Sequence, residues 1–171
     1  INSGEQLPDF WCDYDRGTRT FDNVAQCLAK FRGSDVETAR HMMATAITYQ
    51  EQIAQTAELI SELKRGGYRL FVLSNMSKEY IDFLRKMPVY QYFDGEIISC
   101  EVGLVKPEKE IYSLLLERFC LDPAQTMFID DRKENVVAAA ELGITPFHFD
   151  RKNPEQSCSQ IRELLNNRGE H

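Results

Sequence analysis

The chain has 171 residues, which suits one domain or one domain with a small insertion and is long enough to bury a hydrophobic core. Its composition, 43% hydrophobic and 27% charged, is that of a globular protein rather than a disordered one. The formal net charge of −7 argues against nucleic acid or an anionic membrane as a partner, because both need clustered Lys and Arg. A small anionic substrate in a local pocket remains compatible with that charge.

Targeting and redox signals are weak. The longest apolar runs fall far short of a membrane span, and the N-terminus has no basic segment followed by an apolar one, so neither a membrane anchor nor a signal peptide is predicted. The five cysteines are scattered without a C-x-x-C pair, which favours reduced thiols in a cytoplasmic protein. The three histidines show no metal-ligand spacing.

The first part of the chain is predicted to be helical. Apolar residues recur at helical spacing over residues 20–31, and a second helix is predicted over residues 35–47, after Gly33. This part of the sequence contains no convincing strand. We therefore expect residues 1–52 to form a small helical cap.

From residue 53 the pattern changes to an alternation of helices and short buried strands. Strands are predicted at residues 68–75, 95–100, 126–130 and 145–149. Helices are predicted at residues 53–67, 77–87, 107–119, 133–143 and 156–167. This alternation predicts a doubly wound α/β fold over residues 53–171, with a mostly parallel sheet covered by helices on both faces.

Polar residues stand where the predicted strands end, at the edge where ligands bind in such sheets. One strand ends in Ser74 and Asn75, just before a helix N-terminus that suits an anion. Another ends in Asp130 and Asp131, whose mutual repulsion would be relieved by a cation of the Mg²⁺ type. Lys106 precedes a predicted helix, where it opposes the helix dipole unless a phosphate is held there. Each feature alone has an ordinary structural explanation, but together they predict a site for phosphate and Mg²⁺.

Three segments carry a resemblance to a known family. "VLSN", "GLVKPEKEIY" and "FIDDRKENVVAAAELGI", in this order, resemble motifs two, three and four of the haloacid dehalogenase-like hydrolase superfamily, over roughly residues 53–150. The likeness is to phosphatases of small phosphorylated metabolites, including sugar-1-phosphate phosphatases and the phosphatase domain joined to epoxide hydrolases. It implies a Rossmann-like core, Mg²⁺ as the cofactor, a small phosphorylated metabolite as the substrate, and hydrolysis through an aspartyl-phosphate.

The resemblance also implies a role for each matching residue. The residues that would contact the phosphate are Ser74, Asn75 and Lys106. Lys106 would also steady the nucleophile. Asp130 would bind Mg²⁺ directly, with Asp131 as a second ligand or a ligand through water. Asn135 would brace this loop from the following helix.

Asp13 and Asp15 imitate the first motif of the superfamily, Asp-x-Asp-x-Thr or Asp-x-Asp-x-Val at the end of the central strand. In that motif the first Asp attacks phosphorus and the second acts as general acid and base. Here the preceding "LPDFWC" is a poor central strand, Thr18 comes one residue too late, and helical periodicity begins at Phe21. We therefore expect both aspartates to lie on the cap, and neither to be the nucleophile.

No other part of the chain fits the first core strand, so the nucleophile is expected upstream of Ile1. A doubly wound sheet without its central strand would have two unpaired strand edges and an apolar slot. If the chain begins at Ile1, we expect poor folding or a partner that supplies this strand.

Other functions stay open. A non-catalytic, truncated member of the family would keep the scaffold without turnover. A metal-free dehalogenase is disfavoured by Asp130 and Asp131, and a phospho-acceptor signalling domain by the order of its residues, since its acidic pair comes early and its Lys last. Substrate identity is not predicted. Trp11, Tyr14 and Arg16 are weak candidates for a substrate pocket on the cap, with packing as the alternative.

Overall fold

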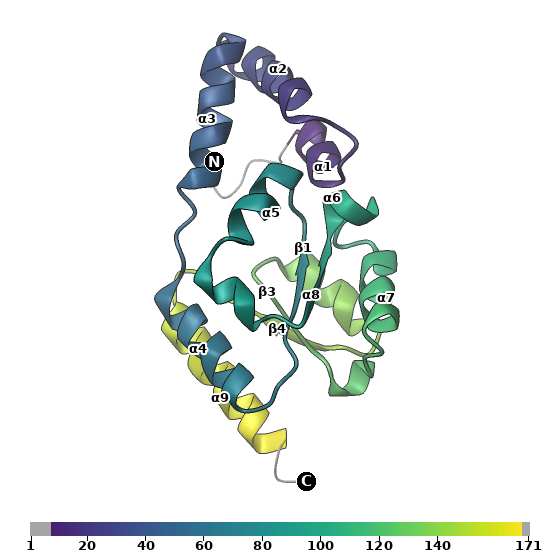
Figure 1. The fold of residues 1–171 in the computed structure, drawn as a ribbon. Helices are drawn as coiled ribbons and strands as arrows, with labels where there is room; N and C mark the ends of the chain where they lie inside the picture. The colour runs from purple at the N-terminus through teal and green to yellow at the C-terminus, as the bar shows by residue number, and fades with distance from the viewer. Residues whose placement is uncertain (1–7, 169–171) are drawn as a thin grey trace.

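The computed structural model describes residues 8–168, which form an α/β fold. The α-helices within these residues are α1 (Asp9–Asp15), α2 (Phe21–Arg32), α3 (Val36–Thr48), α4 (Ala54–Arg65), α5 (Lys78–Leu84), α6 (Ser99–Val102), α7 (Lys109–Arg118), α8 (Lys133–Ala140) and α9 (Pro154–Arg168). The strands are β1 (Phe71–Ser74), β2 (Gly95–Ile98), β3 (Met127–Asp130) and β4 (Thr145–His148). Two short 3₁₀ helices, η1 (Pro88–Tyr92) and η2 (Pro123–Gln125), complete the order. Figure 1 shows the strands in the middle of the molecule, with α1, α2 and α3 at one end.

The helices α1 to α3, called the cap below, pack on one another. The side chains of Thr20 and Asp35 cap α2 and α3 by accepting hydrogen bonds from backbone N–H groups three residues on. Gly33, in the left-handed conformation, ends α2. Between these helices lies a cluster of buried residues: Tyr14, Val24, Ala25, Leu28, Ala29, Ala39 and Met43. This cluster is separate from the hydrophobic clusters around the strands.

The strands form two parallel pairs rather than one sheet. β1 pairs with β2, so that Ser74 lies opposite Ile98, and β3 pairs with β4, so that Asp130 lies opposite His148. Within residues 8–168 no strand joins the two pairs. The α/β fold with parallel strands is confirmed, and the separation into two pairs agrees with the unpaired strand edges expected when the first core strand is absent. Among the described residues, no strand lies between β1 and β3 with which both could pair. Ile129 of β3 is 39% exposed.

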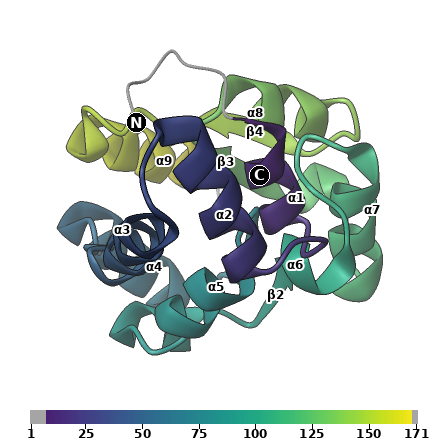
Figure 2. The same ribbon diagram turned by 90° about the horizontal axis from the view of Figure 1, so that it is seen from above.

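Helices cover both faces of the strand pairs, as the alternation of elements predicted. On one face, α7 and α8 pack against β1, β2 and β3 through a cluster that includes Leu73, Tyr112 and Phe128. On the other, α4 and α9 pack against β4 through Leu59, Phe147 and further buried residues. Figures 1 and 2 both show α4 beside α9 and α7 beside α8, on opposite sides of the strands.

Two local differences from the sequence prediction bear on the site. α7 begins at Lys109 instead of Pro107, so Lys106 lies in the preceding loop rather than at the helix itself. A single helical turn, α6, follows β2 directly and ends at Gly103, which has a left-handed conformation. The loop that connects α6 and α7 therefore covers residues 103–108 and contains Lys106.

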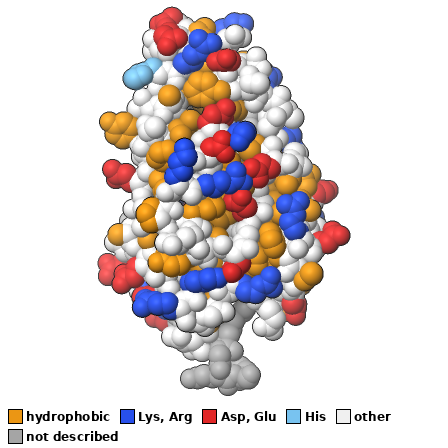
Figure 3. Space-filling model, viewed as in Figure 1, with side chains coloured by type: hydrophobic (Ala, Val, Ile, Leu, Met, Phe, Trp, Pro, Cys, Tyr) orange, Lys and Arg blue, Asp and Glu red, His pale blue; other side chains and the backbone are white. Residues whose placement is uncertain are grey.

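The surface carries charges of both signs. On the face drawn in Figure 3, Lys and Arg side chains alternate with Asp and Glu, and hydrophobic side chains lie between them. Each helix in the part of the chain that the structure describes is too short or too polar to cross a lipid bilayer.

Candidate active site

A buried ion pair lies where β1 and β3 end. The Lys106 ammonium donates to Asp130 Oδ2 at 2.6 Å and to the backbone carbonyl of Leu73 at 2.9 Å. The side chains of Lys106 and Asp130 are only 8% and 7% exposed. Leu73 belongs to β1 and Asp130 to β3, so this one ammonium links the two strand pairs. Removing two charges from water is costly, so a buried ion pair is stable only when its geometry is good and further hydrogen bonds satisfy both groups.

Asn75 fixes the backbone that carries this lysine. Its side-chain amide donates to the Lys106 carbonyl at 2.9 Å, and its side-chain oxygen accepts from the Lys106 N–H at 2.8 Å. Ser74 is the last residue of β1, next to Asn75. The structure therefore brings Asn75 and Lys106 into direct contact, although 31 positions separate them in sequence.

The second carboxylate oxygen of Asp130 is also occupied. Asp130 Oδ1 accepts from the Arg132 N–H at 2.8 Å and from the Asn135 side-chain amide at 2.9 Å. Asn135 is buried, and its carbonyl accepts from the Tyr112 hydroxyl at 2.9 Å. Asn135 thus braces the Asp130 carboxylate from the first turns of α8.

Asp131 lies differently from its neighbour. Its carboxylate pairs with the exposed Arg151 at 3.3 Å, and its carbonyl lies 3.0 Å from His148 Nε2. Its side chain is 39% exposed. Of the two adjacent acids, the structure joins only Asp130 to Lys106.

The oxygen donors of this edge match the chemistry of Mg²⁺. That ion binds one or two carboxylates and completes its shell with water and substrate phosphate. Asp130 and Asp131 provide two adjacent carboxylates, but residues 8–168 contain no group of three or more His, Cys, Asp or Glu side chains that could hold a metal. A magnesium ion at this edge would therefore need further oxygen ligands besides these two carboxylates.

Asp13 and Asp15 lie on helix α1 and not at the end of a strand, which confirms that part of the sequence prediction. Asp13 pairs with Arg19 at 2.8 Å within the cap. Asp15 ends α1, and its backbone carbonyl accepts a hydrogen bond from the Ser99 hydroxyl. Burial raises the pKa of the Asp15 carboxyl to about 6, although Arg132 opposes this effect.

The end of α1 docks on the rest of the molecule. Tyr14 is 3% exposed, and its hydroxyl donates to Glu79 of α5 at 2.7 Å. The ring of Trp11 lies 6.1 Å from that of Tyr14, within the cap. Two of the three residues considered for a substrate pocket on the cap are therefore engaged in packing or docking.

The third, Arg16, reaches the loop that carries Lys106. Its guanidinium makes two hydrogen bonds to Glu108, at 2.6 and 3.0 Å, and a third to the Gly103 carbonyl at 3.0 Å. Sequence reasoning missed Glu108. The only signal for it was its place directly after the "VKP" segment, which does not identify a partner 92 positions away.

Comparison with known proteins identifies the family of this chain. The family model described as haloacid dehalogenase-like hydrolase matches residues 4–143. The sesquiterpene phosphatase astK of Aspergillus oryzae is 31% identical over 113 residues, which are 66% of this chain and 57% of that protein. The chloroplast flavin mononucleotide hydrolase 1 of Arabidopsis thaliana is 24% identical over 158 residues, which are 92% of this chain and 62% of the hydrolase. The chain thus spans less than two thirds of the length of either relative.

The fold is also found in solved structures. A haloacid dehalogenase family enzyme of Bacteroides thetaiotaomicron, solved in complex with magnesium and inorganic phosphate, superposes with a TM-score of 0.71 at 25% identity. The similarity covers 85% of this chain and 76% of that enzyme. The family match extends over most of the sequence, and the likeness first seen in three short motifs is confirmed. The chain belongs to the haloacid dehalogenase-like hydrolases.

Proposed function

We propose that this chain provides the phosphate-binding and metal-binding part of a Mg²⁺-dependent phosphatase acting on a small phosphorylated metabolite. The observation that carries the proposal is the buried Lys106–Asp130 pair at the carboxyl ends of β1 and β3. A lysine and an aspartate held together at such an edge offer a cation for phosphate oxygens and an anion for a metal. The phosphatases among the relatives support the same reaction class.

In this proposal the residues of the edge divide the work of phosphoryl transfer. The Ser74 hydroxyl and the Asn75 amide bind the transferring phosphoryl group at the end of β1. Lys106 neutralises charge on the phosphate oxygens, for which its ammonium leaves its present partner, Asp130. Positioning and electrostatic stabilisation of this kind supply most of the rate enhancement in phosphoryl transfer.

Magnesium would be held by Asp130, with Asp131 as a second ligand or a ligand through water. When bound, the ion would neutralise charge on the phosphate and orient it for in-line attack. Asn135 and the Arg132 N–H keep the Asp130 carboxylate in one orientation through their hydrogen bonds to Oδ1. Because Oδ1 accepts both of these hydrogen bonds, Oδ2 is the Asp130 oxygen that would bind Mg²⁺.

The nucleophile would come from a parallel strand inserted between β1 and β3, which would place an aspartate beside Lys106. Three features favour this arrangement: the two separate parallel pairs, the exposure of Ile129 and the position of Asp13 and Asp15 on α1. The aspartate would attack phosphorus and form the aspartyl-phosphate, and a second acid would protonate the leaving group and then activate water.

The test has a binding arm and an activity arm. In the natural full-length protein, Mg²⁺ should raise the melting temperature, because it binds the folded state preferentially. An Asp130→Asn, Asp131→Asn double variant should lose this response together with hydrolysis of a generic phosphate ester. An unchanged Mg²⁺ response in the double variant would contradict the metal assignment. A wild-type protein that binds Mg²⁺ and phosphate without turnover would instead identify a non-catalytic member of the family.

A further inference from the structure

The geometry points to Arg16 as a positioning residue for Lys106, acting from the cap through Glu108. This inference rests on the proposed phosphatase function and adds to it a residue that lies outside the phosphate and metal ligands. It predicts that Lys106 is correctly placed only when the cap is docked on the core.

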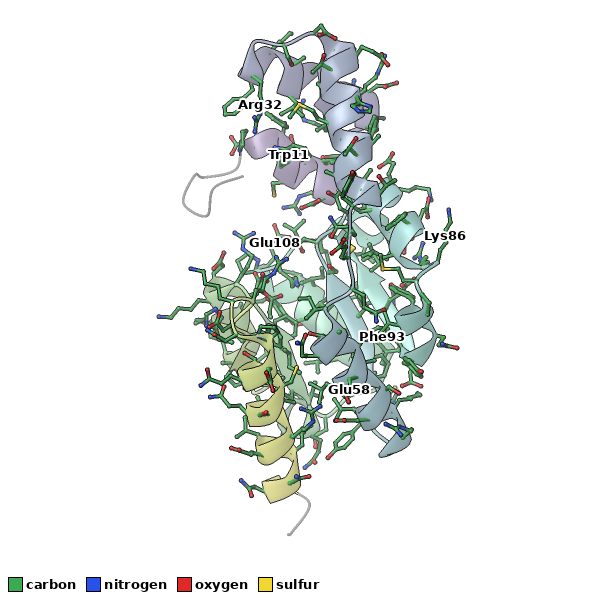
Figure 4. All side chains as sticks on the ribbon, turned by 90° about the vertical axis from the view of Figure 1, so that its left-hand side faces the viewer. Trp11, Arg32, Glu58, Lys86, Phe93 and Glu108 are labelled. Carbon is green, nitrogen blue, oxygen red and sulfur yellow. The ribbon has the colours of Figure 1, made fainter. Side chains whose placement is uncertain are left out.

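The first step is the contact itself. Arg16 Nη2 and Nη1 donate to the two carboxylate oxygens of Glu108 at 2.6 and 3.0 Å, which is the two-pronged geometry that an Arg–carboxylate pair adopts at its strongest. Nη1 also donates to the Gly103 carbonyl at 3.0 Å. The side chains of Arg16 and Glu108 are 28% and 36% exposed, so the contact lies at the rim of the cap rather than free in solvent. Figure 4 shows Glu108 on the part of the core nearest the cap helix that carries Trp11.

The second step is the loop. Arg16 holds the segment 103–108 at both of its ends, at Gly103 by the carbonyl and at Glu108 by the carboxylate. Inside this segment, Glu108 Oε2 accepts a further hydrogen bond from the Val105 N–H at 3.1 Å. The carboxylate that receives Arg16 therefore also fixes the backbone immediately before Lys106. The Arg16 contact lowers the pKa of Glu108, which keeps this carboxylate charged and able to accept both bonds.

The third step is the lysine. Asn75 holds the Lys106 backbone from the side of β1, and the Glu108–Arg16 pair holds its neighbours from the side of the cap. An ammonium that must leave Asp130 for a phosphate oxygen needs a backbone that does not move with it. Loss of either clamp would leave the Lys106 side chain present but imperfectly placed.

The docking of α1 adds an independent constraint on Arg16. The Ser99 hydroxyl donates to the Asp15 carbonyl and the Tyr14 hydroxyl donates to Glu79, so one backbone and one side-chain hydrogen bond hold the end of α1 on the core just before Arg16. Gly17 lies so close to α6 that an added Cβ would come within 2.4 Å of the Cys100 carbonyl oxygen. Arg16 is thus presented from a docked segment and not from a freely moving loop.

The experiment compares Arg16→Gln, Arg16→Lys and Glu108→Gln in the natural full-length protein. Arg16→Gln and Glu108→Gln should each lower kcat by roughly tenfold or more, since misplacing a reacting group by about 1 Å can cost on the order of 10²-fold, while KM changes little. Arg16→Lys should keep part of the activity, because it retains the charge but not the fork. Arg19→Gln is the matched control: Arg19 is a neighbouring cap arginine whose 2.8 Å ion pair, with Asp13, stays within the cap.

A second measurement does not depend on catalysis. Hydrogen exchange at the Val105 N–H should be faster in Arg16→Gln and Glu108→Gln than in wild type and in Arg19→Gln. If the wild-type protein hydrolyses phosphate esters and a folded Arg16→Gln variant keeps its kcat, the positioning role is overturned while the phosphatase proposal stands. If the wild type shows no turnover, the phosphatase proposal fails, and hydrogen exchange at the Val105 N–H alone tests the role of Arg16. Faster exchange in Arg16→Gln and Glu108→Gln would support that role, and unchanged exchange would overturn it. Should Arg16→Gln not fold, Glu108→Gln takes its place in both measurements.

Discussion

Replacing Lys106 with Met should destabilise the protein markedly, although Met keeps most of the length of the lysine side chain and replaces its apolar stem. It removes the positive charge from a pair whose two side chains are 8% and 7% exposed, and leaves the Asp130 carboxylate buried. Breaking a buried ion pair from one side costs about 3–5 kcal/mol. Asp130 would keep the two donors at Oδ1, which places the expected loss near the lower limit, about 3 kcal/mol.

The double variant Lys106→Met, Asp130→Asn separates this effect from a loss of packing. With both charges gone, no uncompensated charge remains, so the double variant should be more stable than Lys106→Met alone. The free energies of unfolding should therefore be strongly non-additive, as expected for two residues in direct contact. Asp130→Asn alone should also destabilise, because it leaves the lysine buried without its anion.

The assay is urea unfolding followed by circular dichroism, in EDTA so that no bound metal contributes. A loss of about 3 kcal/mol corresponds to a fall in Tm of roughly 6–12 °C for a chain of this length. The reasoning would be refuted if the free energy of unfolding of each single variant lay within about 1 kcal/mol of wild type and the two effects added in the double variant. A buried, unscreened charge left without its partner should cost more than that.

Two further predictions concern the segment that joins cap and core. Gly17→Ala should be more destabilising than Gly33→Ala: both glycines have a left-handed conformation, but an added Cβ meets the Cys100 carbonyl oxygen only at Gly17, and no atom within 4 Å at Gly33. We expect about 1 kcal/mol for Gly33→Ala and about 2 kcal/mol more for Gly17→Ala, measured by thermal or urea unfolding; equal losses would contradict the close approach. Asp15→Asn should stabilise the protein at pH 7.5 by on the order of 2 kcal/mol and leave its stability unchanged at pH 4. The folded-state pKa of Asp15, about 6, lies above the ordinary 3.8, so the wild type loses stability as the pH rises from about 4 through 6. A variant without this carboxyl does not lose that stability. If the free energies of unfolding of the variant and the wild type changed in parallel with pH, the assignment would be disproved.

The sequence predicted those parts of the fold that depend on local patterns. The strands ending at Ser74 and Asp130 were found because short apolar runs end in polar residues there, and both lie at strand ends in the structure. The helices predicted from spacing at residues 20–31 and 35–47 are present as α2 and α3. Asp13 and Asp15 were assigned to the cap because the residues before them could not form a central strand, and they lie on α1.

Contacts between distant segments could not be predicted in this way. The pairing of Arg16 with Glu108 joins residues 92 positions apart, and hydrophobic periodicity has no information at that range. The different surroundings of Asp130 and Asp131 were equally hidden, since two adjacent acids at a strand end look alike in sequence while one is buried and the other pairs with Arg151. The alternation of elements predicted parallel strands, and the missing first core strand predicted a gap between them, but the pattern does not reveal which strands become neighbours.

The separation of the strands into two pairs has a consequence for how the protein behaves during synthesis and storage. Until a strand lies between β1 and β3, their facing backbone groups can accept a strand from any chain, including another copy of this one. Ile129, 39% exposed on β3, would add apolar surface to such an encounter. Material in which this position is unfilled should therefore bind hydrophobic dyes and aggregate with increasing concentration, and a synthetic parallel strand that fits between β1 and β3 should act as a solubilising agent.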